Sequence, residues 1–276
     1  MTSTPKRVRA LVDACHPGPT ATVTLIVTAL SAAAGRSAGG VLLMALATLT
    51  GQLSVGWSND AYDADRDLRA GRTTKPTVRG DVAAAFLWRS AGAALVSTLV
   101  LSYVAAGAVG GSAHVVAVAS AWTYNLVLKT TVLSPLPYAV SFGLVPAFVT
   151  YGLTPPVAPA AWVTATCVLL GVGAHLANAI PDVESDEIVA AGGLVARIGV
   201  RVSTWLALTC LVAAVCLLAT RLDAATWVRV ALIAVAAGGA VGVALLGRGQ
   251  ALFRYVMVLA VVAVVLLVVA ARSITA

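Results

Sequence analysis

Charged residues are scarce in this sequence. Of its 276 residues only 11% are Asp, Glu, Lys or Arg, whereas 60% are hydrophobic. The mean hydropathy of +0.95 lies far above the range of soluble globular proteins. This composition excludes a soluble enzyme or a soluble binding module, and it predicts an integral membrane protein.

Cysteine pairs at metal-binding spacing are also lacking. The four cysteines are Cys15, Cys167, Cys210 and Cys216, and no two of them form a C-x-x-C pair. All but Cys15 lie in apolar runs. We interpret them as small hydrophobic residues, not as a metal site or a disulfide framework. Concentrated basic patches are missing too, because the cations are dispersed over the polar connections, and this excludes a nucleic-acid partner.

Long apolar runs take up most of the chain, without the alternation that is typical of strands. Because a backbone in lipid must satisfy its own hydrogen bonds, we expect these runs to be helices. Nine of them are long enough to cross a bilayer: residues 20–37, 40–57, 82–103, 112–128, 132–152, 160–180, 203–220, 225–246 and 250–271. We predict one all-α membrane domain over residues 1–276, with nine transmembrane helices in a single bundle around a central cavity open to the cytoplasmic side.

The cations predict the orientation of this bundle. If the N-terminus is cytoplasmic, 14 of the 18 Lys and Arg residues fall in cytoplasmic segments, which agrees with the positive-inside rule. The composition, rich in Ala and Arg, is typical of a high-GC bacterium. We therefore expect a multi-pass protein of the plasma membrane, with its N-terminus and its active site facing the cytoplasm and with the lipid bilayer as its surroundings.

The acidic residues are concentrated in two short segments. Eight of the 11 lie in WSNDAYDADRDLRAGRTTKP (57–76) and NAIPDVESDEIVAAGG (178–193): these are Asp60, Asp63, Asp65, Asp67, Asp182, Glu184, Asp186 and Glu187. Each segment follows an apolar run, the second and the sixth. Even-numbered spans end on the same side of the membrane, so we expect the two acidic segments to meet at the cytoplasmic face.

Helical spacing places most of these acids on common faces. Asn59 with Asp60, then Asp63 and Asp67, share one face of a continued helix, whereas Asp65 points away. The second segment repeats the four-residue spacing with Asn178, Asp182 and Asp186.

Stacked carboxylates repel each other, and each charge costs about 2.5–3.5 kcal/mol at a bilayer centre. Bound Mg²⁺, which takes oxygen ligands, would offset both costs. A solvated, charge-mixed loop is the alternative, but it does not explain why two segments share one spacing and one side.

Four segments together resemble the UbiA superfamily of intramembrane prenyltransferases. Residues 59–67 form an N-D-x-x-D-x-x-x-D motif, and residues 182–186 form a D-x-x-x-D motif. GRTTKP (71–76) resembles the tail of the first motif, and YNLVLK (124–129) resembles a family segment with Tyr and Lys at its ends. The sequence departs from the family at His16-Pro17, where members often carry Arg-Pro, and at Thr130, where many carry Arg.

This resemblance implies a Mg²⁺-dependent transfer of a prenyl group from a prenyl diphosphate to an acceptor, through an allylic carbocation. It implies a metal site made of Asn59, Asp60, Asp63, Asp67, Asp182 and Asp186. The five aspartates and Lys129 would be catalytic. Further contacts with the substrates are expected from Arg66, Arg72, Lys75, Tyr124, Asn125, Asn178 and His175.

Several alternatives remain open. His175 faces the same cavity as Asn178, where it could position an acceptor or simply bond to a neighbouring helix; Asn125 could reach phosphate or cap a broken helix. The acceptor is unassigned and could be a phenol, a quinone precursor, a sugar phosphate or a lipid. A UbiA-type terpene cyclase would use the same residues. A transporter is less consistent, since proton relays are usually single acids deep in the membrane, and a CDP-alcohol phosphotransferase lacks its D-G-x-x-A-R motif here.

Overall fold

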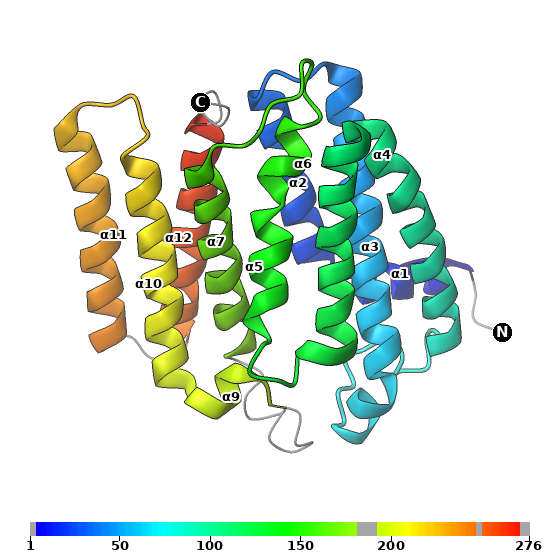
Figure 1. Cartoon of the computed structure of the whole chain (residues 1–276). Coiled ribbons are helices and arrows are strands. Elements are labelled where there is room, and N and C mark those ends of the chain that lie inside the picture. Colours follow the sequence, from blue (N-terminus) through cyan, green and yellow to red (C-terminus); the bar gives the residue numbers. More distant parts are fainter. Residues whose placement is uncertain (1–3, 181–191, 247–249, 271–276) are drawn as a thin grey trace.

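The computed structural model describes residues 4–180, 192–246 and 250–270, and its regular elements are all helices. Most of them run side by side along one axis (Figure 1). In chain order they are α1 (Thr4–Ala14), α2 (Pro17–Ala33), α3 (Ala38–Arg69), α4 (Ala84–Thr123), η1 (Tyr124–Leu128), α5 (Pro135–Gly143), α6 (Val145–Thr150), α7 (Ala161–Ala179), α9 (Leu194–Ile198), α10 (Val200–Ala219), α11 (Thr226–Leu246) and α12 (Gln250–Val269).

Four helical segments are long and apolar enough to cross a membrane. These are Ala38–Arg69, Ala84–Leu128, Ala161–Ala179 and Val200–Ala219. Shorter apolar helices cover Pro17–Ala33, Pro135–Thr150, Thr226–Gly242 and Val258–Val269. The prediction of an all-helical bundle is confirmed, and each predicted apolar run coincides with a helical segment. The count of nine crossings stays a prediction.

The chain reverses inside α4 at Gly107. This residue has φ 64° and ψ −165°, a conformation that is open to glycine but not to a helical residue. Ser102 Oγ lies 2.7 Å from His114 Nδ1, although twelve residues of straight helix would separate them by about 18 Å. The predicted runs 82–103 and 112–128 therefore lie on either side of a fold-back. Arg36 donates to the carbonyl of Ala105, next to this turn.

Helix α3 lies between α2 and α4 and contacts both halves of α4. Thr98, before the reversal, donates to Thr50 on α3, and Trp122, after it, donates to Ser54. Close packing is possible here because α3 carries glycines at its contacts. A Cβ on Gly51 would stand 3.1 Å from Val118 Cγ2.

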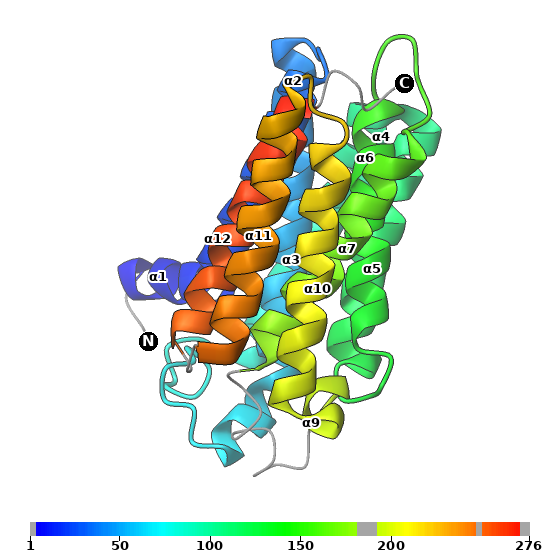
Figure 2. The same cartoon turned by 90° about the vertical axis from the view of Figure 1, so that its left-hand side faces the viewer.

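A short amphipathic helix, α1, precedes the first predicted run and lies across the bundle axis (Figure 2). Its Ala10 and Ala14 are buried, and the carbonyl of Leu11 accepts a hydrogen bond from Trp57 Nε1 of α3 at 2.9 Å. The sequence analysis did not predict this helix, because it is too short and too polar to stand out as a span. It fixes the start of α2, where Pro17 occupies the first helical position.

Candidate functional site

The last turns of α3 carry the first acidic segment. The helix continues to Arg69, so Asp60, Asp63 and Asp67 lie one above another and are all buried. Asp65 is exposed, as its position on the opposite face predicts. Asn59 is half-buried.

Each buried aspartate is paired with a cation that the sequence analysis singled out. Lys75 Nζ lies 2.6 Å from Asp60 Oδ1. Asp63 is paired on two sides, with Arg66 at 3.1 Å and with Lys129. The four cations of the prediction thus converge on the acidic face, and the last pair, Arg72 NH1 with Asp67 Oδ1, is 3.2 Å long.

A tight turn after α3 brings two of these cations back to the helix. Gly71 follows the end of α3 with φ 65°, the left-handed conformation that commonly terminates helices. The backbone N–H of Arg72 then donates to the carbonyl of Asp67, and that of Lys75 donates to the carbonyl of Arg72. These bonds hold the GRTTKP segment against the acids.

The site retains unused acidic oxygens that suit a cation. Within the described residues, Asp60 Oδ2 and Asp67 Oδ2 are buried and have no hydrogen-bond partner. Buried carboxylate oxygens are normally paired, so each orphan points to a missing ligand. Oxygen donors of this kind are the ligands that Mg²⁺ prefers, so the residues present fit this ion.

The described part of the site is nevertheless incomplete. No three His, Cys, Asp or Glu side chains of residues 4–180, 192–246 and 250–270 converge on one point in the manner of a closed metal site. The other predicted ligands, Asp182 and Asp186, lie outside the described residues. Helix α7, which leads into them, ends at the same end of the bundle as α3 (Figure 1).

His16 joins the acidic face, through contacts that the sequence does not predict. Its Nε2 atom lies 2.9 Å from Asp60 Oδ1 and 3.3 Å from Lys75 Nζ. It has the left-handed backbone conformation (φ 54°, ψ 70°) at the junction of α1 and α2. His16 stands in the dipeptide that departs from the family pattern, and its ring contacts the first aspartate of the motif.

One widened helical turn, η1, positions Lys129. The N–H of Lys129 donates to the carbonyl of Tyr124, five residues earlier, instead of four as in an α-helix. Asn125 in this turn donates to the carbonyl of Val55 at 2.9 Å and to Ser58 Oγ at 3.1 Å. These two bonds tie η1 to α3, which is neither of the roles expected for Asn125; a contact of Asn125 with phosphate stays a prediction. Burial lowers the pKa of Lys129, and the carboxylate of Asp63 opposes that shift.

His175 belongs to an aromatic cluster with Tyr124 and Tyr138. Its ring centroid lies 4.8 Å from that of Tyr138 and 5.7 Å from that of Tyr124. Its Nε2 atom is hydrogen-bonded to Ser134 Oγ at 3.0 Å. Asn178, by contrast, is exposed at the end of α7. The sequence analysis missed Ser134 and Tyr138, which have no motif around them.

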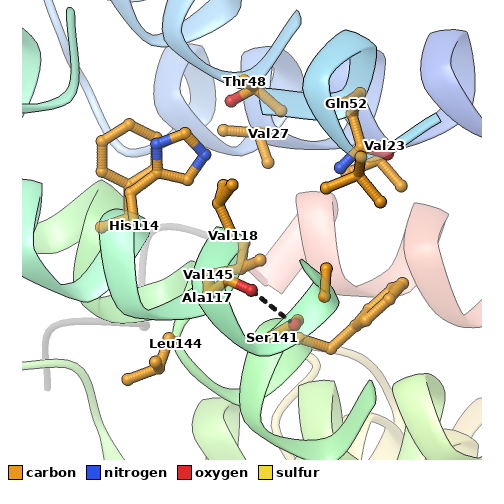
Figure 3. Close-up of a pocket in the computed structure, with 14 residues that line it drawn as sticks. Val23, Val27, Thr48, Gln52, His114, Ala117, Val118, Ser141, Leu144 and Val145 are labelled. Atoms are coloured by element: carbon orange, nitrogen blue, oxygen red, sulfur yellow. Dashed lines mark hydrogen bonds between the residues drawn. The ribbon is translucent and has the colours of Figure 1, made fainter. Parts of the chain in front are cut away.

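An apolar pocket lies inside the bundle (Figure 3). Side chains of α2, α3, α4, α5 and α6 line it. Among them are Thr48, Gln52 and Val55 of α3 and His114, Val118 and Ala121 of α4. Figure 3 also shows the hydrogen bond that Ser141, which lines the pocket, donates to the carbonyl of Ala117 at 2.8 Å.

Solved structures with the same fold match almost the whole chain. The structure of a UbiA homologue from Archaeoglobus fulgidus bound to DMAPP and Mg²⁺ matches with a TM-score of 0.70 and 15% identity, over 96% of this chain and 99% of that one. A structure of digeranylgeranylglyceryl phosphate synthase matches with a TM-score of 0.69 and 14% identity, over 97% and 99%. The apo structure of a UbiA homologue from Aeropyrum pernix K1 matches with a TM-score of 0.66 and 20% identity, over 89% and 96%. Because the sequence identities are this low, the matches show a shared fold and nothing further.

Family membership rests on the sequence match. No curated protein sequence matches the chain. Residues 20–262, however, match the family model described as the UbiA prenyltransferase family. That segment contains both acidic segments and Lys129, and it covers well over half of the sequence. The chain therefore belongs to the UbiA prenyltransferase family.

Proposed function

We propose that the protein is a Mg²⁺-dependent intramembrane prenyltransferase that uses a prenyl diphosphate donor. The observation that carries this proposal is the buried stack of Asp60, Asp63 and Asp67, with orphaned carboxylate oxygens and with cations on every member. The Archaeoglobus fulgidus homologue, with the same fold, is bound to DMAPP or GPP together with Mg²⁺. The motif residues of the family occur here at the positions that form the stack.

The proposed metal ligands are Asn59, Asp60, Asp63 and Asp67, completed by Asp182 and Asp186. Bound Mg²⁺ would supply positive charge to the diphosphate as it leaves. We expect four cations to share the negative charge of the departing diphosphate. They are the cations paired with the acids: Lys129, Arg66, Arg72 and Lys75. Such fixed charges act where negative charge develops in the transition state.

The reaction is heterolysis followed by capture of the cation. The allylic C–O bond breaks, its electron pair leaves with the diphosphate, and the prenyl carbon becomes a carbocation. A nucleophilic atom of the acceptor then forms the new bond and releases its proton. Apolar helices around the site would keep water from the cation, and the ring of Tyr124 can stabilise positive charge.

The membrane arrangement that fits this reaction is a nine-span bundle in the plasma membrane. Its acidic end would face the cytoplasm, where the donor is dissolved. The loops at that end carry most of the basic residues, which supports this orientation.

A terpene cyclase is the second candidate. In a cyclase the double bonds of the donor capture the cation, so no site for an acceptor is needed. One observation favours it: His16, in place of the family's Arg, contacts Asp60. Acceptor-dependent product formation separates the two candidates.

The test uses the purified protein in detergent with prenyl diphosphates, with and without Mg²⁺, and measures release of diphosphate and the mass of organic products. Asp63→Asn should abolish the Mg²⁺-dependent release. Asp65→Asn, on the exposed face of the same helix, is the matched control and should retain it. Equal release from both variants, or release without Mg²⁺, would contradict the proposal. A cyclic product without an added acceptor would identify the cyclase.

A further inference from the structure

Tyr62 is an exposed aromatic residue in the middle of the first acidic motif. It lies on α3 directly before Asp63, and its relative exposure is 48%. The ammonium group of Lys129 stands over its ring, with the Nζ atom 5.0 Å from the ring centroid. The proposed function gives a role to the lysine and to Asp63, but none to this ring.

Two successive residues of α3 contact the same ammonium group. Lys129 follows the widened turn η1, and its side chain is only 10% exposed. Asp63 Oδ1 accepts a hydrogen bond from its Nζ atom, and the face of the Tyr62 ring lies beside that atom. Successive side chains of a helix diverge by about 100°, so the two partners meet the ammonium from different directions. The lysine therefore has one charged partner and one neutral partner.

The charged partner is the one that a metal ion would claim. Asp63 is a proposed ligand of Mg²⁺, and both of its oxygens are bonded to cations, Oδ1 to Lys129 and Oδ2 to Arg66. A divalent ion on this carboxylate would neutralise it and would repel the ammonium. The face of an aromatic ring is not a ligand that Mg²⁺ prefers, so its attraction for the ammonium persists when the metal is bound.

We propose that Tyr62 is a positioning residue whose ring keeps the ammonium group of Lys129 at the acidic face while Mg²⁺ occupies Asp63. This inference rests on the proposed function, because it concerns the positive charge that the leaving diphosphate meets. An ammonium held by a ring face keeps its hydrogens free for diphosphate oxygens, whereas one bonded to a carboxylate does not. The ring acts through the lysine and touches no reacting atom.

The first experiment measures Mg²⁺-dependent release of diphosphate from the prenyl diphosphate that the wild-type protein uses fastest. Tyr62→Leu removes the ring and should lower kcat about 3- to 30-fold, the range of cation–π attractions. KM should change less than about threefold, because the charge that the lysine meets develops in the transition state. Tyr62→Phe keeps the ring face and should retain the wild-type kcat. In a Lys129→Met background, Tyr62→Leu should have no further effect.

The second experiment changes the charge of the ring but not its shape. Phenylalanine with one, two or three fluorine atoms, incorporated at position 62, has a progressively less negative ring face. The value of kcat should fall with each fluorine, towards that of Tyr62→Leu. The same series at Tyr103 is the matched control. Tyr103 is a similarly exposed tyrosine (45%) beside the turn at Gly107, and fluorination there should leave kcat unchanged.

The outcomes separate this inference from the proposed function. An equal loss in Tyr62→Phe and Tyr62→Leu would assign the effect to the hydroxyl group and refute the role of the ring. The same kcat throughout the fluorine series at position 62, or a further loss from Tyr62→Leu in the Lys129→Met background, would also refute it. No release of diphosphate from any donor by the wild-type protein would refute the proposed function itself, and the role of Tyr62 with it.

Discussion

Gly56→Ala should loosen the first aspartate of the site without altering any charged residue. Gly56 lies on α3 against the junction of α1 and α2. A Cβ there would stand 2.6, 2.8 and 2.9 Å from the O, C and Cα atoms of Cys15. All three are backbone atoms, so no side chain can rotate to make room. The junction must move, and with it the neighbouring residue, His16, which contacts Asp60.

The expected change in the free energy of unfolding of Gly56→Ala follows from two opposing effects. Overpacking a tight contact costs typically about 1–3 kcal/mol. Replacing a helical glycine by alanine gains about 0.5–1 kcal/mol where space permits. We expect a net loss of about 1–2 kcal/mol, which lowers the melting temperature by about 2–4 °C per kcal/mol in a chain of this size.

The assay is thermal unfolding in detergent, followed by measurement of Mn²⁺ binding by electron paramagnetic resonance. Gly92→Ala is the matched control, since no atom lies within 4 Å of its added Cβ. It should raise the melting temperature and leave Mn²⁺ binding unchanged. Gly56→Ala should lower the melting temperature and change Mn²⁺ affinity. If the two variants behave alike, the close approach of Gly56 to Cys15 is not present in the protein.

Three further predictions concern charges and carbonyls. Lys129→Met removes a cation that contacts Asp63 and should lower kcat about 10²–10³-fold, as loss of one transition-state donor does; wild-type kcat would refute its role. Lys75→Met frees Asp60 from its ammonium partner, so it should tighten Mn²⁺ binding severalfold but weaken donor binding. Calorimetry measures both affinities, and a change of both in the same direction would contradict this prediction. Arg36→Met removes the hydrogen bond from Arg36 to the carbonyl of Ala105 and should lower the free energy of unfolding by about 1–3 kcal/mol. An unchanged melting temperature would refute this prediction.

Much of the fold could be predicted because lipid imposes simple rules on sequence. Backbone groups must be satisfied within each helix, so apolar run length alone marks the helices. The break in α4 at Gly107 falls in the gap between the predicted runs 82–103 and 112–128. The burial of Asp60, Asp63 and Asp67 followed from helical spacing, because α3 continues beyond the apolar run to Arg69.

What the sequence did not predict depends on contacts between distant segments. The contact of His16 with Asp60 spans 44 residues and is set by the docking of α1, which is amphipathic and short. The hydrogen bond of His175 to Ser134 likewise joins two helices. The stacking of His114 on Phe148 also depends on a distant contact, which the turn at Gly107 makes possible. Spacing within one helix carries no information about such pairs.

The widened turn η1 has a consequence for deletions and insertions in the gene. It contains one more residue than an α-helical turn between Tyr124 and Lys129. Deletion of one residue there would restore a regular helix but rotate everything after it by about 100°. Lys129 would then leave Asp63 while the helix itself stayed intact. The length of this turn is therefore constrained as strictly as the identity of the lysine, whereas the residue types within it, apart from Tyr124 and Asn125, are freer to vary.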